Sequence, residues 1–250
     1  MRDPGSGWIQ LSAVEFHLLW STMELGETPE VLDLLHVGRT PARRAELVEE
    51  TSEALAARDL GTVTAPARDL AGMLRALGTC TSSLDMRVYG TGDPMFAFAG
   101  AGPSGAALAA RVGDEVRLGT IRATALAASL LGSLTPLPAA PGRPVNVNAA
   151  DYEDACAEGE YDGVSGFART LQSAGLRMAD VSTLTQALTT RNGGGQLGAT
   201  GRIRTYSVVN WVDTPDGRYA LRRNGEWITV TPADTSRLTS MAEEMLADVS

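Results

Sequence analysis

The chain has no lysine, so all 21 of its basic residues are arginines. The missing amine excludes Schiff-base chemistry, the lysine of a phosphate-binding loop and every Ser–Lys dyad. Acidic residues number 30 and leave a formal net charge of −9. That charge has the wrong sign for a protein that neutralises nucleic-acid phosphates. We therefore expect neither those enzyme classes nor a nucleic-acid partner.

Histidine and cysteine are nearly as scarce, with two of each. His17 lies far from His36 in the sequence, and Cys80 lies far from Cys156, so no ligand spacing typical of a zinc site exists. No G-x-S-x-G nucleophile motif occurs either. Two cysteines are too few to staple a secreted scaffold of this size. We predict reduced cysteines, no metal, no cofactor and no enzymatic activity.

Long hydrophobic runs are also absent. The longest uncharged stretch, residues 123–142, is interrupted by three prolines, and its apolar part is shorter than the ~20 residues that cross a bilayer. Residues 1–7 contain no apolar segment typical of a signal peptide. We therefore expect a cytoplasmic protein without membrane insertion. Its 44% apolar content is nevertheless enough to build a sizeable core.

The first half of the chain has apolar residues at helical spacing, followed by a change to the alternation typical of strands. Ser12 and Glu15 form a capping box before the first helix, and Thr40 precedes a proline at the start of the second. The pattern predicts helices over 12–25, 41–55 and 66–77, strands over 84–89, 95–100, 105–112 and 114–119, and a helix over 126–134.

After a proline-rich connector at 135–144, the same order of elements recurs. The pattern predicts helices over 149–158, 163–174 and 180–190, strands over 195–199, 203–212, 217–223 and 226–231, and a final helix after Pro232. Short turns join the strands, which favours an antiparallel sheet. We predict one α+β domain over residues 1–250, with an antiparallel sheet and two helical bundles, built from pseudo-twofold duplicated halves at about 8–134 and 145–250.

A glycine-rich segment, Gly100–Gly105, fits the G-x-G-x-x-G pattern and follows an apolar run. A dinucleotide site needs a long helix directly after these glycines, with its N-terminus facing the pyrophosphate. Gly113 follows too soon for such a helix. We interpret the segment as a hairpin turn. A nucleotide-dependent oxidoreductase built on this loop is the alternative function.

The predicted strand over 203–212 carries apolar residues on both of its faces. We assign Trp211 to the core. The sequence leaves open whether the opposite face is covered by a second helical layer or is exposed to a partner. We predict that this opposite face binds a partner through four residues: Arg204, Tyr206, Val208 and Asn210.

Two sets of motifs, one near each end of the chain, resemble those of a known family. The first half carries Val14–Phe16, Leu19–Trp20, Leu25–Pro29, Gly38–Thr40 and Arg58–Gly61. The second half carries Gly195–Gln196, Trp211–Tyr219 and Trp227–Asp234. As an ordered set over nearly the whole chain, these segments resemble the EspG family, the secretion-associated chaperones of actinobacterial ESX (type VII) systems.

The resemblance implies a cytosolic, non-enzymatic α+β chaperone with quasi-twofold symmetry, present as a monomer or weak homodimer. It implies a PE–PPE-type heterodimer as the partner, gripped at the exposed tip of the PPE helical bundle by the sheet and the C-terminal helical bundle. A third interpretation is a related chain that has lost its cargo and acts as a structural partner.

Overall fold

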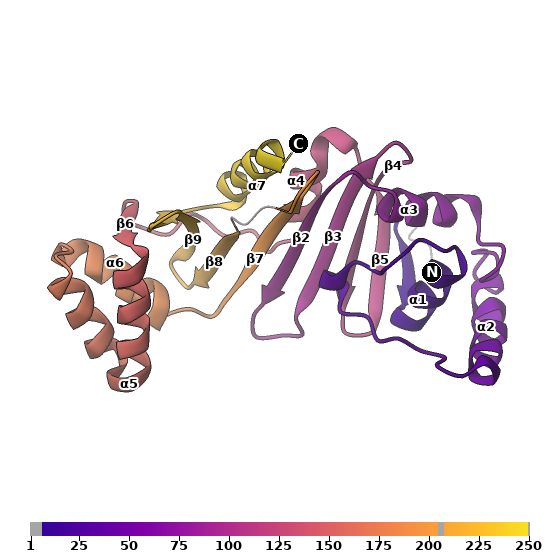
Figure 1. The fold of residues 1–250 in the computed structure, drawn as a ribbon, viewed down its shortest axis with the longest axis horizontal. Helices are drawn as coiled ribbons and strands as arrows, with labels where there is room; N and C mark the ends of the chain where they lie inside the picture. The colour runs from indigo at the N-terminus through magenta and orange to yellow at the C-terminus, as the bar shows by residue number, and fades with distance from the viewer. Residues whose placement is uncertain (1–6, 205–207, 250) are drawn as a thin grey trace.

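The computed structural model describes residues 7–204 and 208–249, and these form a ten-stranded sheet with helices on both faces (Figure 1). The strands are β1 (Ile9–Ser12), β2 (Ser82–Tyr89), β3 (Met95–Gly102), β4 (Gly105–Val112), β5 (Glu115–Thr120), β6 (Val145–Asn148), β7 (Gly193–Thr200), β8 (Val209–Thr214), β9 (Gly217–Asn224) and β10 (Trp227–Pro232). The helices are α1 (Ala13–Thr22), α2 (Pro41–Ala56), α3 (Arg68–Gly78), α4 (Leu126–Leu131), α5 (Ala149–Ser173), α6 (Met178–Thr189) and α7 (Thr235–Val249), with 3-10 turns η1 (Glu30–Leu32) and η2 (Ala123–Ala125).

Local sequence signals account for the helix starts. At α1, the Ser12 hydroxyl accepts a hydrogen bond from the Glu15 amide (3.1 Å), and the Glu15 carboxylate accepts one from the Ser12 amide (2.8 Å). This is the predicted capping box. At α2, the Thr40 hydroxyl accepts from the Arg43 amide, and Pro41 occupies the first turn, where no amide hydrogen is needed.

Neighbouring strands all run antiparallel, in the order β1-β5-β4-β3-β2-β7-β8-β9-β10-β6. The predicted α+β class with an antiparallel sheet is confirmed. Read from each edge to the centre, the order is the same in both halves, and β2 meets β7 in the middle. Gly113 (φ 57°) and Gly225 (φ 60°) provide left-handed residues in corresponding hairpins. Descent of the halves from a duplication stays a prediction.

The glycine-rich segment forms a hairpin turn. Gly102 pairs with Gly105, and Gly105 opens β4, which pairs with β3 along its length. Because a strand follows these glycines instead of a helix, the N-terminal amides that a pyrophosphate requires are missing at this site. The interpretation as a turn is confirmed, and the alternative of a nucleotide-dependent oxidoreductase built on this loop is wrong.

One predicted strand is wrong at its described first residues. The sequence pattern placed a strand over 203–212, but β8 begins at Val209, residues 203, 204 and 208 precede it, and residues 205–207 lie outside the described residues. The chain turns sharply at Gly201, and Arg204 bridges back to the end of β7. A Cβ at Gly201 would lie 2.1 Å from the carbonyl oxygen of Val249, so the turn packs directly against the end of α7. This contact between distant segments overrides the local alternation.

Helix α5 consists of two arms. The backbone is non-helical at Asp162 and Gly163, and Gly163 has φ 61°. The rings of Tyr152 and Phe167, one from each arm, lie 6.0 Å apart in an edge-to-face contact. On a straight helix, residues with this separation would lie about 22 Å apart. The two arms therefore fold back on each other, which agrees with the two helices predicted over 149–158 and 163–174.

The sheet has opposite polarity patterns on its two faces. A row of directly paired residues on one face is apolar in its middle and polar at its ends: Gln10, Arg117, Ala110, Ala97, Met86, Leu197, Val209, Arg222, Thr229 and Asn146. Helices α4 and α7 pack on this apolar middle (Figure 1). We call this side the covered face.

The adjacent row on the other side shows the reverse pattern. It is apolar at its ends and polar in its middle: Leu11, Val116, Arg111, Phe96, Arg87, Gln196, Asn210, Leu221, Val230 and Val145. Helices α1–α3 bury one end and α5–α6 bury the other. Between these two groups of helices the middle of the sheet is left without a helical layer (Figure 1). The paired rows thus explain where each helix packs.

Candidate partner-binding surface

The uncovered middle of the sheet, which we call the open face, is formed by β2, β3, β7 and β8. Its central side chains are Asp85, Arg87, Tyr89, Phe96, Gln196 and Asn210. Asn210 is exposed, and Tyr89 exposes 53% of its surface. Of the two possibilities that the sequence left open for this side of β8, exposure is therefore correct at Asn210.

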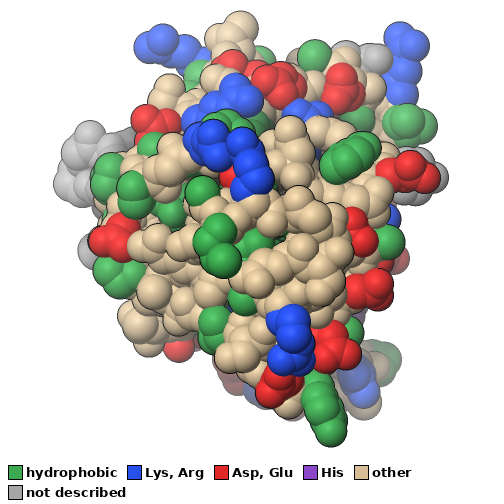
Figure 2. Space-filling model, turned by 90° about the vertical axis from the view of Figure 1, so that its left-hand side faces the viewer, with side chains coloured by type: hydrophobic (Ala, Val, Ile, Leu, Met, Phe, Trp, Pro, Cys, Tyr) green, Lys and Arg blue, Asp and Glu red, His purple; other side chains and the backbone are tan. Residues whose placement is uncertain are grey.

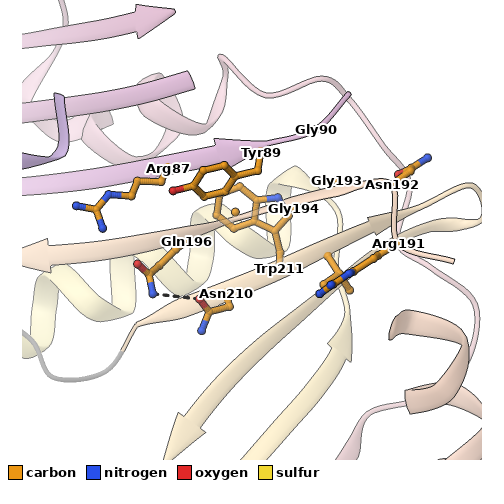
Figure 3. A pocket seen from close by; sticks show the side chains of 12 residues that line it. Arg87, Tyr89, Gly90, Arg191, Asn192, Gly193, Gly194, Gln196, Asn210 and Trp211 are labelled. Atoms are coloured by element: carbon orange, nitrogen blue, oxygen red, sulfur yellow. Dashed lines mark hydrogen bonds between the residues drawn. The ribbon is translucent and has the colours of Figure 1, made fainter. Parts of the chain in front are cut away.

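A groove of about 570 Å³ lies on the open face where β2, β7 and β8 meet (Figure 3). Two glycines of β7 at the groove leave no room for a side chain. A Cβ at Gly194 would lie 2.3 Å from the carbonyl oxygen of Trp211, and a Cβ at Gly195, on the covered side of the strand, would lie 2.3 Å from the buried Trp211 ring. Real Cβ atoms do not approach other atoms so closely, so the strand must be free of side chains at these positions.

The polar groups of the groove are mostly hydrogen-bond donors. Gln196 Nε2 donates to Asn210 Oδ1 at 3.2 Å, which links β7 to β8 across the groove floor. Arg87 and Arg191 line opposite ends of the groove (Figure 3). Neither makes an ion pair with a residue that the structure describes.

Aromatic and aliphatic surface borders these polar groups. The Tyr89 ring meets the Phe96 ring edge to face, with 6.4 Å between centroids. The guanidinium carbon of Arg111 lies 5.5 Å from the centroid of Phe96, and Arg111 also donates to the carbonyl oxygens of Leu32 in η1 and of Asp33. The open face therefore combines a donor-rich groove with an exposed aromatic wall.

The turn after β7 carries Arg204 over the open face. Its guanidinium donates two hydrogen bonds to the Asp85 carboxylate, at 2.7 and 3.0 Å. A Cβ at Gly198 would lie 2.9 Å from Arg204 Nη2, so this glycine makes room for the guanidinium. The hydrogen bonds with Asp85 raise the pKa of Arg204. This ion pair covers the part of the open face next to the turn that follows β7.

A second exposed apolar site lies at the tip of α5, where its two arms meet. Tyr161 exposes 93% of its surface, and Val164 is also exposed just beyond Gly163. Met178, 68% exposed, opens α6 in the same helical group. Figure 2, viewed from this end of the molecule, shows hydrophobic side chains among uncharged surface, with acidic side chains toward the rim.

Comparison with known proteins identifies the family. Residues 12–244 match the family model described as the EspG family. The chain belongs to the EspG family. The resemblance found in the sequence motifs is thereby confirmed.

A solved structure supports the fold of this EspG-family chain. This chain is similar to the Mycobacterium tuberculosis type VII secretion system chaperone EspG5, whose structure was solved in complex with a PE25–PPE41 dimer. The TM-score is 0.77 and the sequence identity is 16%. The match covers 97% of this chain and 96% of that chain. At this identity the likeness shows a shared fold. No curated protein sequence matches the chain.

The four residues predicted to bind a partner have different positions in this EspG-family structure. Asn210 lies on the open face opposite Trp211, which is 2% exposed, as the alternation predicted. Arg204 also reaches the open face, but from a turn and not from the predicted strand. Val208 precedes β8 and is half-buried, and Tyr206 lies outside the described residues. Partner binding by these four stays a prediction.

Sequence reasoning did not select Arg87, Tyr89 or the tip of α5. Arg87 and Tyr89 alternate with buried residues along β2, which marks them as one face without showing that the face is uncovered. Tyr161 and Val164 flank the Asp162–Gly163 break, and apolar residues beside a helix-breaking pair are a signal that would have located the tip.

The scarce cysteines and histidines form no group arranged to hold a metal ion among the described residues. Cys80 and Cys156 are both free, and burial raises the pKa of each thiol, which disfavours the reactive thiolate. The His17 and His36 rings lie 5.1 Å apart. Over the described residues, no group of three or more side chains is arranged to hold a metal ion, and no helix is long and apolar enough to span a bilayer.

Proposed function

We propose that this chain is a cytoplasmic chaperone of a type VII secretion system that binds a PE–PPE-type heterodimer, keeps it soluble and delivers it for secretion. The EspG-family match over residues 12–244 carries the proposal. The related fold of EspG5, which was determined with a PE25–PPE41 dimer bound, supports it. No bond is made or broken in this function, which agrees with the absence of lysine and of a nucleophile motif.

The proposed contact surface consists of the open face and the tip of α5. An apolar helical tip exposed in the cytoplasm self-associates, and burying two large apolar side chains contributes about 1.5–3 kcal/mol each. Tyr89 and Tyr161 offer exposed rings to such side chains. The polar groups around them suit an interface that must release its cargo, because a small apolar centre with a polar rim is compatible with modest affinity.

Co-expression with PE–PPE pairs from the same genome tests the proposal. We expect one pair to co-purify with the chain as a defined complex in size-exclusion chromatography. Failure of every pair to form a complex, with the chain folded, would contradict the proposed function and favour a structural partner that has lost its cargo.

The predicted contact residues are tested in the same system. We expect Val208→Asp to abolish co-purification while the chain stays folded, because the predicted alternation assigns Val208 to the same face as Asn210, and the variant adds a charge to that predicted surface. Val112→Asp is the control for an added charge, since Val112 is exposed at the end of β4, outside the open face. Equal recovery of cargo by wild type and Val208→Asp would reject this surface.

A further inference from the structure

The groove on the open face has a local charge opposite to that of the whole chain. Among its described lining residues are two arginines, Arg87 and Arg191, and no aspartate or glutamate. The chain as a whole carries a formal net charge of −9. A donor-rich groove without carboxylates in an acidic protein attracts acidic groups selectively, because the remainder of the surface repels them.

Two carboxylates beside the groove are already paired inside the protein. Asp85, on the same face as Arg87, accepts two hydrogen bonds from Arg204. Asp213, beside the start of β7, accepts hydrogen bonds from Arg218 at 2.6 and 3.2 Å, and the Arg218 side chain is 1% exposed. Their charges are therefore balanced locally, and they do not compensate Arg87 or Arg191.

The amide pair on the groove floor adds further donors. Asn210 Oδ1 accepts from Gln196, so the amide group of Asn210 has its oxygen occupied. Its Nδ2 hydrogens make no hydrogen bond with a described residue. The guanidinium and amide donors that face this groove have no negatively charged acceptor among its lining residues. Carboxylate oxygens meet this need, and hydrogen bonds in which both groups are charged are shorter and stronger than neutral ones.

From this arrangement we infer that Arg87 and Arg191 select the partner by binding carboxylate side chains in the groove, one at each end, while the Tyr89 ring packs against the apolar groups between them. The inference rests on the proposed function, because it names the chemistry of the PE–PPE segment that docks on the open face. The segment that fits carries acidic residues flanking an apolar centre.

The test uses the PE–PPE pair that co-purifies with the wild-type chain. We expect Arg87→Gln and Arg191→Gln each to weaken its binding about five- to tenfold and the double variant about 50-fold, by calorimetry at low ionic strength. Binding by wild type weakens as salt increases, and the double variant loses most of this dependence. Arg87→Lys and Arg191→Lys keep the charge and retain most of the affinity.

Matched controls separate recognition from stability. Arg75→Gln removes an arginine from the exposed side of α3, far from the groove, and leaves both affinity and salt dependence unchanged. The groove variants keep the wild-type unfolding temperature, because neither arginine makes an ion pair with a described residue. A charge reversal identifies the partner residue. Arg87→Glu is combined with cargo variants in which each acidic residue of the PPE tip is replaced by arginine, one at a time. Binding is restored only by the replacement at the residue that Arg87 contacts.

Three outcomes overturn the inference and are distinguishable. If no PE–PPE pair binds the folded wild-type chain, the proposed function fails together with the inference. If a pair binds and the double variant retains full affinity and salt dependence, only the inference fails. Stabilisation of wild type by millimolar inorganic phosphate or ATP, lost in the double variant, would overturn it in favour of a phosphate site.

Discussion

The two faces of the sheet are made by alternate residues of the same strands, yet their polarity patterns are opposite. On the covered face, the middle is apolar and packs against α4 and α7. On the opposite side of the sheet, the middle is polar and forms the open face, whereas the ends are apolar, so helices pack only at the ends. Helix placement in this fold therefore follows from where each row across the sheet is apolar, and a surface remains uncovered where the row is polar.

The largest difference in stability is expected between two single variants that add the same charge to β7, one on each face of the sheet. Leu197→Glu buries a carboxylate in the apolar middle of the covered face without a partner, and we expect it to lower the free energy of unfolding by about 5 kcal/mol or more. Gln196→Glu faces the groove and should change it by less than about 0.5 kcal/mol. Urea unfolding at pH 7, followed by circular dichroism, measures both. Similar losses would contradict the assignment of the two faces.

The two Asp–Arg ion pairs beside the open face differ in burial and sharpen the comparison further. Asp213→Asn leaves the buried Arg218 charge uncompensated, and we expect a loss of about 3–5 kcal/mol. Asp85→Asn removes the partner of the solvent-accessible Arg204, and the expected loss is about 1 kcal/mol or less. Thermal unfolding of the two variants side by side gives the difference, and equal shifts would show that Arg218 is better solvated than its position indicates.

The close packing of β7 against the buried Trp211 ring predicts a smaller but specific effect. Gly195→Ala forces a methyl group into the Trp211 ring and into the carbonyl oxygen of Arg87, each 2.3 Å away, and should cost about 1–3 kcal/mol. Gly72→Ala is the control, because nothing lies within 4 Å of a Cβ there and the residue is inside α3. Alanine should stabilise that helix by about 0.5–1 kcal/mol. Chemical denaturation of both variants checks the opposite signs.

The smallest effect concerns the first half of the chain, which holds both histidines. Burial, His36 and Arg44 lower the pKa of His17 below its ordinary value of 6.5. The unfolded chain therefore binds a proton at this residue before the folded chain does, and stability falls as the pH drops below about 6.5. His17→Leu should flatten this part of the stability profile. Unfolding temperatures of wild type and variant between pH 7.5 and 5 measure the difference, and parallel profiles would contradict it.

Local sequence patterns predicted most of the elements, because caps, helical spacing and hairpin turns act over a few residues. The strand over 105–112 coincides with β4, and Trp211 and Asn210 lie on the two faces that alternation assigned. The strands β1 and β6 were missed because each has four residues, too few for a distinct alternation. The duplicated halves and the division into one domain stay predictions.

The candidate site was less predictable, because it depends on pairing between distant strands. Arg87, Gln196 and Asn210 form one row only through the registers of β2 with β7 and of β7 with β8. Arg204 reaches Asp85 through a turn that the α7 contact imposes. No pattern within a single segment specifies such a row, so sequence alone located one strand of the surface and missed its neighbours.

The meeting of β2 and β7 at the centre of the sheet has an evolutionary consequence. The groove takes its walls from both halves of the polypeptide. The three hydrophobic clusters, in contrast, consist mostly of residues that do not line the groove. Under the proposed function, exchanges of exposed side chains at this seam, such as Arg87 and Asn210, would alter the cargo contact without disturbing the apolar clusters. A change in one half of the chain could then be matched by a change in the other.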